Sequence, residues 1–239
     1  MQILKGLYQL GGDMNGLSWA GVDAGYEDAN SYLLQGSDGA ILFDCGCGDT
    51  WGQLEERLAY WGISIDSIHA CFLTHAHLDH AGGAALVQKM GIPIYAHRET
   101  AEAVAAGDER CAGFLYHKEF KVFQVDHVVE DELPVKVVGI DIDVFHLPGH
   151  SRGCTAFRFN HEDRKVVVSG DVIGTLLAGD FGWDGSIDFD REAYLQSLIR
   201  MSSIDMDIML PGHGMIYFHE PRRRVESVLN QALMQWRRA

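Results

Sequence analysis

The chain is poor in proline and in basic residues, and its cysteines follow no regular spacing. Its 239 residues include 5 prolines and 5 cysteines, and 19 basic residues stand against 34 acidic ones, for a formal net charge of −15. An odd number of unevenly spaced cysteines argues against a secreted disulfide framework, so we expect a cytoplasmic protein. Nucleic acid is not expected as a partner, because so acidic a chain would repel a phosphate backbone.

Long apolar runs are also missing. No stretch approaches the roughly 18 to 20 apolar residues that a membrane span needs, and Met1–Tyr8 lacks the apolar core of a signal peptide. Hydrophobic residues still make up 47% of the chain, which is enough to fill a core without disulfides. We therefore expect a single domain over residues 1–239 and no association with a membrane.

Alternating strand-like and helix-like stretches indicate an α/β protein with two similar halves. In the first half we expect strands at Asn30–Gln35, Ala40–Phe43, Ile68–Leu73 and Ile92–Ala96, and helices at Trp51–Trp61, Ala84–Met90 and Thr100–Ala106. In the second half we expect strands at Val135–Val138, Ile140–Leu147, Thr155–Phe159, Lys165–Val168 and Asp207–Leu210, and helices at Arg191–Ile204 and from Pro221 onward. The segment after Leu73 is expected to be a polar loop.

Metal-ligand residue types gather in this segment, directly after an apolar strand. Three histidines and an aspartate, His75, His77, Asp79 and His80, fall within six residues and precede a Gly-Gly turn. Imidazole nitrogen and carboxylate oxygen are preferred ligands of zinc and related divalent metals. The alternative is a solvated loop that happens to be rich in histidine, and the density of ligand residues argues against it.

Three later segments share one form, an apolar strand that ends in a glycine-flanked ligand residue. These ligand residues are His150, Asp171 and His213, each directly preceded by a glycine. Glycine beside a ligand lets the backbone turn sharply and approach a metal closely. Each segment alone could be an ordinary turn, but together with the histidine-rich segment they predict one metal site.

The combined motifs resemble the signature of the metallo-β-lactamase-fold hydrolases, which is His-x-His-x-Asp-His followed by Gly-His, Gly-Asp and Gly-His, and the resemblance spans nearly the whole chain. It implies a four-layer αββα sandwich with a binuclear metal site on one edge. It further implies one ion held by His75, His77 and His150, a second held by Asp79, His80 and His213, and a bridge by Asp171 and a hydroxide. Two Zn²⁺ ions are the expected cofactor, with Mn²⁺ or Fe²⁺ as alternatives.

The resemblance also implies roles for two aspartates. Two nearby ions lower the pKa of a shared water and polarise a carbonyl or phosphoryl oxygen. Asp79 is expected to orient the attacking hydroxide and to handle its proton. Asp44 lies in a strand-end turn similar to the Asp-x-Gly turn of the family, in which the aspartate supports the ligands from behind.

Aromatic residues in glycine-containing loops are candidates for the substrate pocket. Trp19, Phe181 and Trp183 either line an apolar pocket beside the metals or pack onto the core, and the sequence does not separate these alternatives. The histidines outside the motifs are interpreted as structural or surface residues, and His146 is expected to support the site rather than to ligate.

Two cysteines near the Asp-x-Gly turn invite a metal-binding interpretation. Cys45 and Cys47 are separated by one residue, whereas zinc-binding pairs usually have two or more residues between them. We therefore expect both to be buried as small hydrophobic residues.

The family resemblance implies a metal-dependent hydrolase that acts on a small-molecule thioester, lactone or related ester, similar to glyoxalase II or the lactonases. Asp171 favours this over a β-lactamase, because several β-lactamase subgroups have cysteine or serine there. A strict glyoxalase II is less expected, because that family adds a C-terminal helical region that binds glutathione, whereas the 26 residues after His213 have room for one helix. A phosphodiesterase or phosphotriesterase is an alternative, and an iron-dependent redox enzyme is disfavoured because flavodiiron proteins have glutamate in place of His77.

Overall fold

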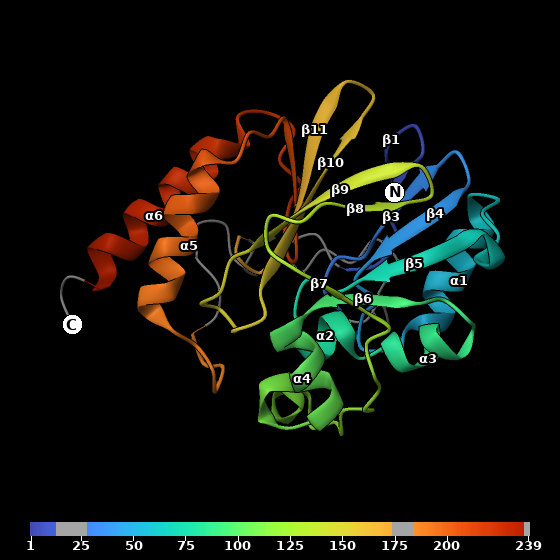
Figure 1. Cartoon of the computed structure of the whole chain (residues 1–239), viewed down its shortest axis with the longest axis horizontal. Coiled ribbons are helices and arrows are strands. Elements are labelled where there is room, and N and C mark those ends of the chain that lie inside the picture. Colours follow the sequence, from blue (N-terminus) through green and yellow to red (C-terminus); the bar gives the residue numbers. More distant parts are fainter. Residues whose placement is uncertain (13–27, 174–183, 237–239) are drawn as a thin grey trace.

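The structure is a computed structural model and describes residues 1–12, 28–173 and 184–236. Within these ranges two β-sheets pack face to face, with helices on both outer sides (Figure 1). In spatial order, the first sheet contains β1 (Gln2–Leu4), β2 (Leu7–Gln9), β3 (Tyr32–Gly36), β4 (Gly39–Phe43), β5 (Ile68–Phe72), β6 (Ile94–His97) and β7 (His127–Val129). The second contains β12 (Ile208–Pro211), β11 (Arg164–Gly170), β10 (Thr155–His161), β9 (Ile140–His146) and β8 (Val135–Val137).

The helices divide into two outer layers. The layer on the first sheet is formed by α1 (Trp51–Tyr60), α2 (Leu78–Ala81), α3 (Ala84–Lys89) and α4 (Arg98–Ala106), with short 3₁₀ helices η1 (Ile65–Ser67), η2 (Glu109–Cys111) and η3 (Gly113–Tyr116). The layer on the second sheet is formed by α5 (Arg191–Ser203) and α6 (Pro221–Trp236), at the left of Figure 1. None of the described helices is long and apolar enough to cross a membrane.

Alternation along the strands builds three separate cores. In β4, Leu42 packs among the helices of the first layer, while Ile41 and Phe43 point between the sheets. In β11, Val167 faces α5 and α6, while its neighbours Val166 and Val168 point between the sheets. Since side chains alternate along a strand, each sheet buries both of its faces. This arrangement confirms the expected αββα sandwich.

The strand directions bring several chain turns to one edge of each sheet. β4, β5, β6 and β7 are mutually parallel, so Asp44 and the histidine-rich segment both follow carboxyl ends at the same edge of the first sheet. In the second sheet β11 is parallel to β12, and β9 is antiparallel to β10, which is antiparallel to β11. The turns that carry His150, Asp171 and His213 therefore also share one edge.

Most predicted helices and strands are confirmed to within a few residues. The structure differs from the prediction in one short helix near the ligand residues and in three short strands. The segment after β5 is not entirely a loop, because Leu78–Ala81 forms α2 and places Asp79 and His80 on a helical turn. β1, β2 and β7 lie outside the predicted elements. Each has three residues, which is too short for a period-2 pattern to be recognised.

Candidate metal centre

Seven side chains from four separate chain segments meet at the common edge of the two sheets. They are the residues that the sequence motifs single out, namely His75, His77, Asp79, His80, His150, Asp171 and His213. Their donor atoms form three groups within which all atoms lie no more than 4.8 Å apart: His75, His77 and His150; His75, His80 and Asp171; and Asp79, His80 and His213. The first and third groups have the same members as the two ligand sets implied by the family resemblance.

Asp171 lies between these two ligand sets. Its Oδ1 is 3.2 Å from His80 Nε2, and its Oδ2 is 3.4 Å from His150 Nε2 and 3.6 Å from His213 Nε2. Asp79 contacts only the second set, with its Oδ2 3.0 Å from His213 Nε2 and 3.7 Å from His80 Nε2. A carboxylate in the position of Asp171 can reach ions on both sides.

Three buried polar atoms at the centre fit a cation. His75 Nε2, His80 Nε2 and Asp171 Oδ1 make no hydrogen bond within the part of the chain that the structure describes, and both imidazoles are fully buried. Burying a polar atom without a partner costs free energy, so such atoms call for an explanation. Lone pairs of two imidazoles and a carboxylate that converge in one place provide the donor set of a divalent metal site.

A hydrogen-bond network behind the ligands selects the imidazole tautomers. Thr74 donates its backbone N–H to Asp44 Oδ1 at 2.8 Å and its hydroxyl to Asp44 Oδ2 at 2.7 Å. Asp44 Oδ2 also accepts from His80 Nδ1 at 2.7 Å, and Thr74 Oγ1 accepts from His75 Nδ1 at 3.1 Å. Because both Nδ1 atoms carry the proton in this network, both Nε2 lone pairs point into the centre.

His77 is held in the opposite orientation by residues of the segment before α5. Its Nε2 donates to Ser186 Oγ at 3.2 Å, and the Ser186 hydroxyl donates to Asp188 Oδ1 at 2.6 Å. Its Nδ1 lies 3.1 Å from His150 Nε2. The network therefore presents Nδ1 of His77, together with Nε2 of His150, to the same ion position.

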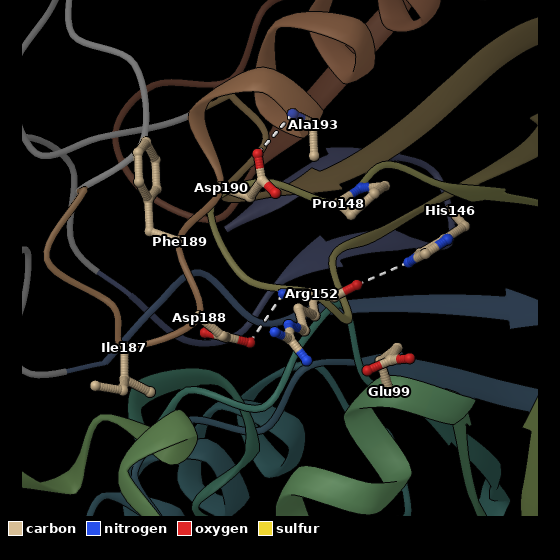
Figure 2. Close-up of a pocket in the computed structure, with 10 residues that line it drawn as sticks. Glu99, His146, Pro148, Arg152, Ile187, Asp188, Phe189, Asp190 and Ala193 are labelled. Atoms are coloured by element: carbon tan, nitrogen blue, oxygen red, sulfur yellow. Dashed lines mark hydrogen bonds between the residues drawn. The ribbon is translucent and has the colours of Figure 1, made fainter.

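A cavity adjoins this supporting network (Figure 2). It has a volume of about 290 Å³, and Asp188 lines it together with Arg152, Ile187 and Phe189. Asp188 Oδ2 accepts from the Arg152 backbone N–H at 2.9 Å, so Asp188 is held through both carboxylate oxygens, Oδ1 by Ser186 and Oδ2 by Arg152. Asp188 therefore both lines the cavity and, through Ser186, supports His77.

Burial and mutual charge set the protonation states of the centre. Burial, aided by His150, lowers the pKa of His77 to about 3, and burial also lowers the pKa of His75 well below its usual value. Burial alone would raise the pKa of the Asp171 carboxyl, but the imidazoles of His213 and His80 hold it well below its usual range. Burial alone would lower the pKa of His80 and of His213, but the carboxylates of Asp171 and Asp79 raise both above the usual value. The favoured forms of His75, His77 and Asp171, two neutral imidazoles and an ionised carboxylate, are those that bind a metal.

Two residues other than the ligands lie close to the centre: Gly212, the glycine of the last Gly-His motif, and Tyr116, which belongs to no motif. A Cβ on Gly212 would lie 2.0 Å from Asp171 Oδ1 and 2.8 Å from His80 Cε1, so only glycine fits beside these residues. The phenol of Tyr116, at the end of η3, interacts with Asp79. Burial of the phenol and the negative charge of Asp79 both raise the pKa of Tyr116. No sequence motif marked Tyr116, because η3 lies far along the chain from the ligand segments.

The remaining sequence expectations have separate outcomes. His146 Nε2 donates to the Arg152 carbonyl at 2.7 Å, so it braces the turn that carries His150, as expected of a supporting residue (Figure 2). Cys45 and Cys47 are buried in the core under the first helical layer, which confirms their prediction as small hydrophobic residues. The proposed pocket residues Trp19, Phe181 and Trp183 lie outside the described residues, and their role stays a prediction.

Sequence reasoning missed the residues that orient the ligands. Thr74 and Ser186 are buried, and their roles depend on which side chains lie against them in the folded chain. A serine or threonine in a turn is too common to mark a site, and Ser186 is 109 residues from the histidine that it contacts. The sequence contains no signal that would have identified them.

Comparison with known sequences agrees with the motif analysis. The family model of the metallo-beta-lactamase superfamily matches residues 24–213. The probable metallo-hydrolase YqgX of Bacillus subtilis is 27% identical over 201 residues, which cover 83% of this chain and 90% of that protein. The hydroxyacylglutathione hydrolase GloC of Haemophilus influenzae is 32% identical over 171 residues (68% and 77%), and the acyl-coenzyme A thioesterase MBLAC2 of Homo sapiens is 29% identical over 175 residues (62% and 60%).

Solved structures show the same fold. The metallo-beta-lactamase FEZ-1 of Legionella gormanii superposes with a TM-score of 0.77 over 100% of this chain and 95% of its own, at 20% sequence identity. At this identity the similarity extends to the arrangement of sheets and helices and carries no information about the substrate.

Proposed function

The chain belongs to the metallo-beta-lactamase superfamily, and from this premise we propose that it is a binuclear metal-dependent hydrolase that cleaves thioesters. One observation carries the proposal above the others. Seven ligand-type side chains converge, and the inward-facing atoms His75 Nε2, His80 Nε2 and Asp171 Oδ1 are buried without hydrogen bonds among the described residues. His80 Nε2 and Asp171 Oδ1 face each other at 3.2 Å, and His75 Nε2 has no hydrogen-bond partner among the described residues, whereas buried polar atoms of a purely structural cluster are usually paired.

In this proposal His75, His77 and His150 would hold one ion and Asp79, His80 and His213 would hold the second, with the Asp171 carboxylate lying between the two sets. When bound, two divalent ions supply a water of lowered pKa and an electrophile for the carbonyl oxygen of the substrate. Zinc suits this mixed set of imidazole and carboxylate donors, and Mn²⁺ or Fe²⁺ are the alternatives.

Asp79 is the proposed proton acceptor. Its Oδ2 lies 3.0 Å from His213 Nε2, and the Tyr116 phenol lies against the same carboxylate. Burial tends to raise its pKa, but His80 and His213 lower it below the usual value. Asp79 is therefore ionised at neutral pH and able to hold a water molecule by one oxygen and to accept its proton.

The chemistry of the leaving group favours thioesters. A thiol of ordinary pKa, about 8.5, departs as a thiolate without a proton donor, whereas an alkoxide or an amine needs one. Burial and Asp79 raise the pKa of Tyr116, so its phenol is a poor acid at neutral pH. In this proposal the six other ligand residues are committed to metal binding and Asp79 also accepts the proton of the water, so among the described residues the site is best suited to a leaving group that needs no protonation.

The relatives support the same choice. Hydroxyacylglutathione hydrolase GloC and acyl-coenzyme A thioesterase MBLAC2 are both named for thioester substrates. A further relative, 28% identical over 191 residues, is the atrochrysone carboxyl ACP thioesterase of Aspergillus fumigatus. These names support a thioester as the substrate class and leave the acyl group and the thiol carrier open.

A substrate panel tests the proposal. Zinc-loaded protein is assayed with acyl-coenzyme A and acylglutathione thioesters, lactones, phosphodiesters and a β-lactam, with metal content measured on the same sample. Thiol release can be followed with a chromogenic thiol reagent, because all five cysteines of the protein are buried and give little background. We expect kcat/KM for at least one thioester to exceed that for every other class by about 100-fold or more. A lactone, phosphodiester or β-lactam that is cleaved fastest would contradict the proposal.

A further inference from the structure

We propose that Asn30 is a positioning residue that fixes His213 for the second ion of the metal centre, the one assigned to Asp79, His80 and His213. The inference rests on the metal binding of the proposed function and does not depend on the substrate. Asn30 lies just before β3, is 1% exposed, and belongs to none of the ligand motifs.

Asn30 binds three backbone carbonyls of the turn that carries His213. Its side-chain Nδ2 donates to the Pro211 carbonyl at 3.0 Å and to the Gly214 carbonyl at 3.2 Å. Its backbone N–H donates to the Gly212 carbonyl at 2.6 Å. One residue therefore holds the peptide groups on both sides of His213.

The orientation of the Asn30 amide is itself fixed. Gln9 Nε2 donates to Asn30 Oδ1 at 2.7 Å, so both N–H bonds of the Asn30 amide must point toward the turn. The Tyr32 hydroxyl donates to the Pro211 carbonyl at 2.7 Å and strengthens the same contact. The donors converge because the carbonyls at the end of β12 and just after it lie in the buried interior, where backbone groups need hydrogen-bond partners.

The same segment also holds a second ligand of the same ion. The backbone N–H of Ala29 donates to the Asp79 carbonyl at 3.1 Å. Ala29 and Asn30 thus tie together the helical turn that carries Asp79 and the strand end that carries His213, which are 134 residues apart. His213 depends on such support more than His80, the other histidine of its set, because the His213 side chain is 16% exposed whereas that of His80 is 0% exposed.

The experiment measures metal affinity in the full chain without substrate. The dissociation constants of both Zn²⁺ sites are determined for wild type and for Asn30→Asp, which keeps the size of the side chain but aims an oxygen at the carbonyls of Pro211 and Gly214. We expect one site to weaken by about 10- to 100-fold, as when partners behind a ligand are removed, and the other to change less than about twofold. Tyr32→Phe removes a single hydrogen bond from the same turn, should fold more readily, and should weaken the same site to a smaller extent.

A double-mutant cycle with His213→Ala identifies the affected site. If Asn30 acts through His213, adding Asn30→Asp to His213→Ala causes little further loss of affinity. Phe159→Leu serves as the matched control, since Phe159 is buried between the sheets and its variant lowers stability without touching this turn. Equal weakening of both sites, additive losses in the cycle, unchanged affinity in Asn30→Asp, or a wild type that binds fewer than two ions would each overturn the inference. A selective loss in a protein that cleaves no thioester would uphold it and reject the proposed substrate class.

Discussion

Replacing Asp44 by asparagine should impair metal binding although Asp44 contacts no ion in the proposed arrangement. Asp44 Oδ2 accepts hydrogen bonds from His80 Nδ1 and from the Thr74 hydroxyl, both at 2.7 Å. Asparagine can keep the bond from the Thr74 backbone N–H, but it then presents N–H groups to His80. The asparagine N–H and the His80 Nδ1–H are both donors and cannot form a hydrogen bond with each other. His80 would therefore carry its proton on Nε2, where Asp171 Oδ1 lies 3.2 Å away. The proton would occupy the lone pair that the ion requires.

The size of this effect follows from the bond that is lost. A hydrogen bond to a charged group contributes about 1.5–3 kcal/mol, and each 1.4 kcal/mol corresponds to about a tenfold change in a binding constant. The affinity of the ion bound by His80 should therefore fall roughly 10- to 100-fold. The backbone should tolerate the change, because Asp44 has φ 54° and asparagine accepts this left-handed conformation as readily as aspartate.

Zinc affinity measured by competition with a chelator, together with thermal unfolding, provides the assay. Asp143→Asn is the matched control, because it weakens a half-buried ion pair with Arg158 at 2.8 Å that belongs to β9 and β10 and should leave zinc affinity unchanged. Wild-type affinity at both sites of Asp44→Asn would refute the tautomer argument.

Three further predictions concern other parts of the molecule. Asp79→Asn should lower turnover by roughly 100-fold or more at saturating metal, because the amide cannot accept a proton; a steady-state kcat measurement checks this, and full activity would reject the role. Gly212→Ala should reduce bound metal below that of wild type in elemental analysis, since its Cβ would lie 2.0 Å from Asp171 Oδ1. Burial, and to a lesser extent the neighbouring imidazole of His146, lowers the pKa of His97 to about 4, whereas a histidine in the unfolded chain has a pKa of about 6.5. Because the unfolded chain takes up this proton first, the contribution of neutral His97 to the free energy of unfolding is lost as the pH falls from 6.5 toward 4. His97→Asn keeps a side-chain acceptor at this helix start but does not titrate, so urea unfolding should show a smaller loss over that range than in wild type.

The sequence by itself determined the candidate ligand residues and most of the elements that carry them. Apolar runs of strand length end directly at His150, Asp171 and His213, and this local pattern is visible without the fold. The alternation of apolar residues in strands and their spacing in helices involve residues that are close together in the chain, so both patterns can be recognised without the folded structure. The same patterns left α2 unrecognised, because four residues form too short a helix to show a period.

Only the tertiary structure decided how these residues work together. Asp44 and Thr74 fix the tautomers of His75 and His80, and Asn30 holds the turn of His213 from 183 residues away. Such partners are chosen by the packing of distant segments, and an asparagine or threonine in isolation has no distinctive spacing. The sequence could therefore name the donors of a metal site, whereas their orientation and protonation required the two sheets to be brought together, because hydrogen bonds between distant segments exist only in the folded chain.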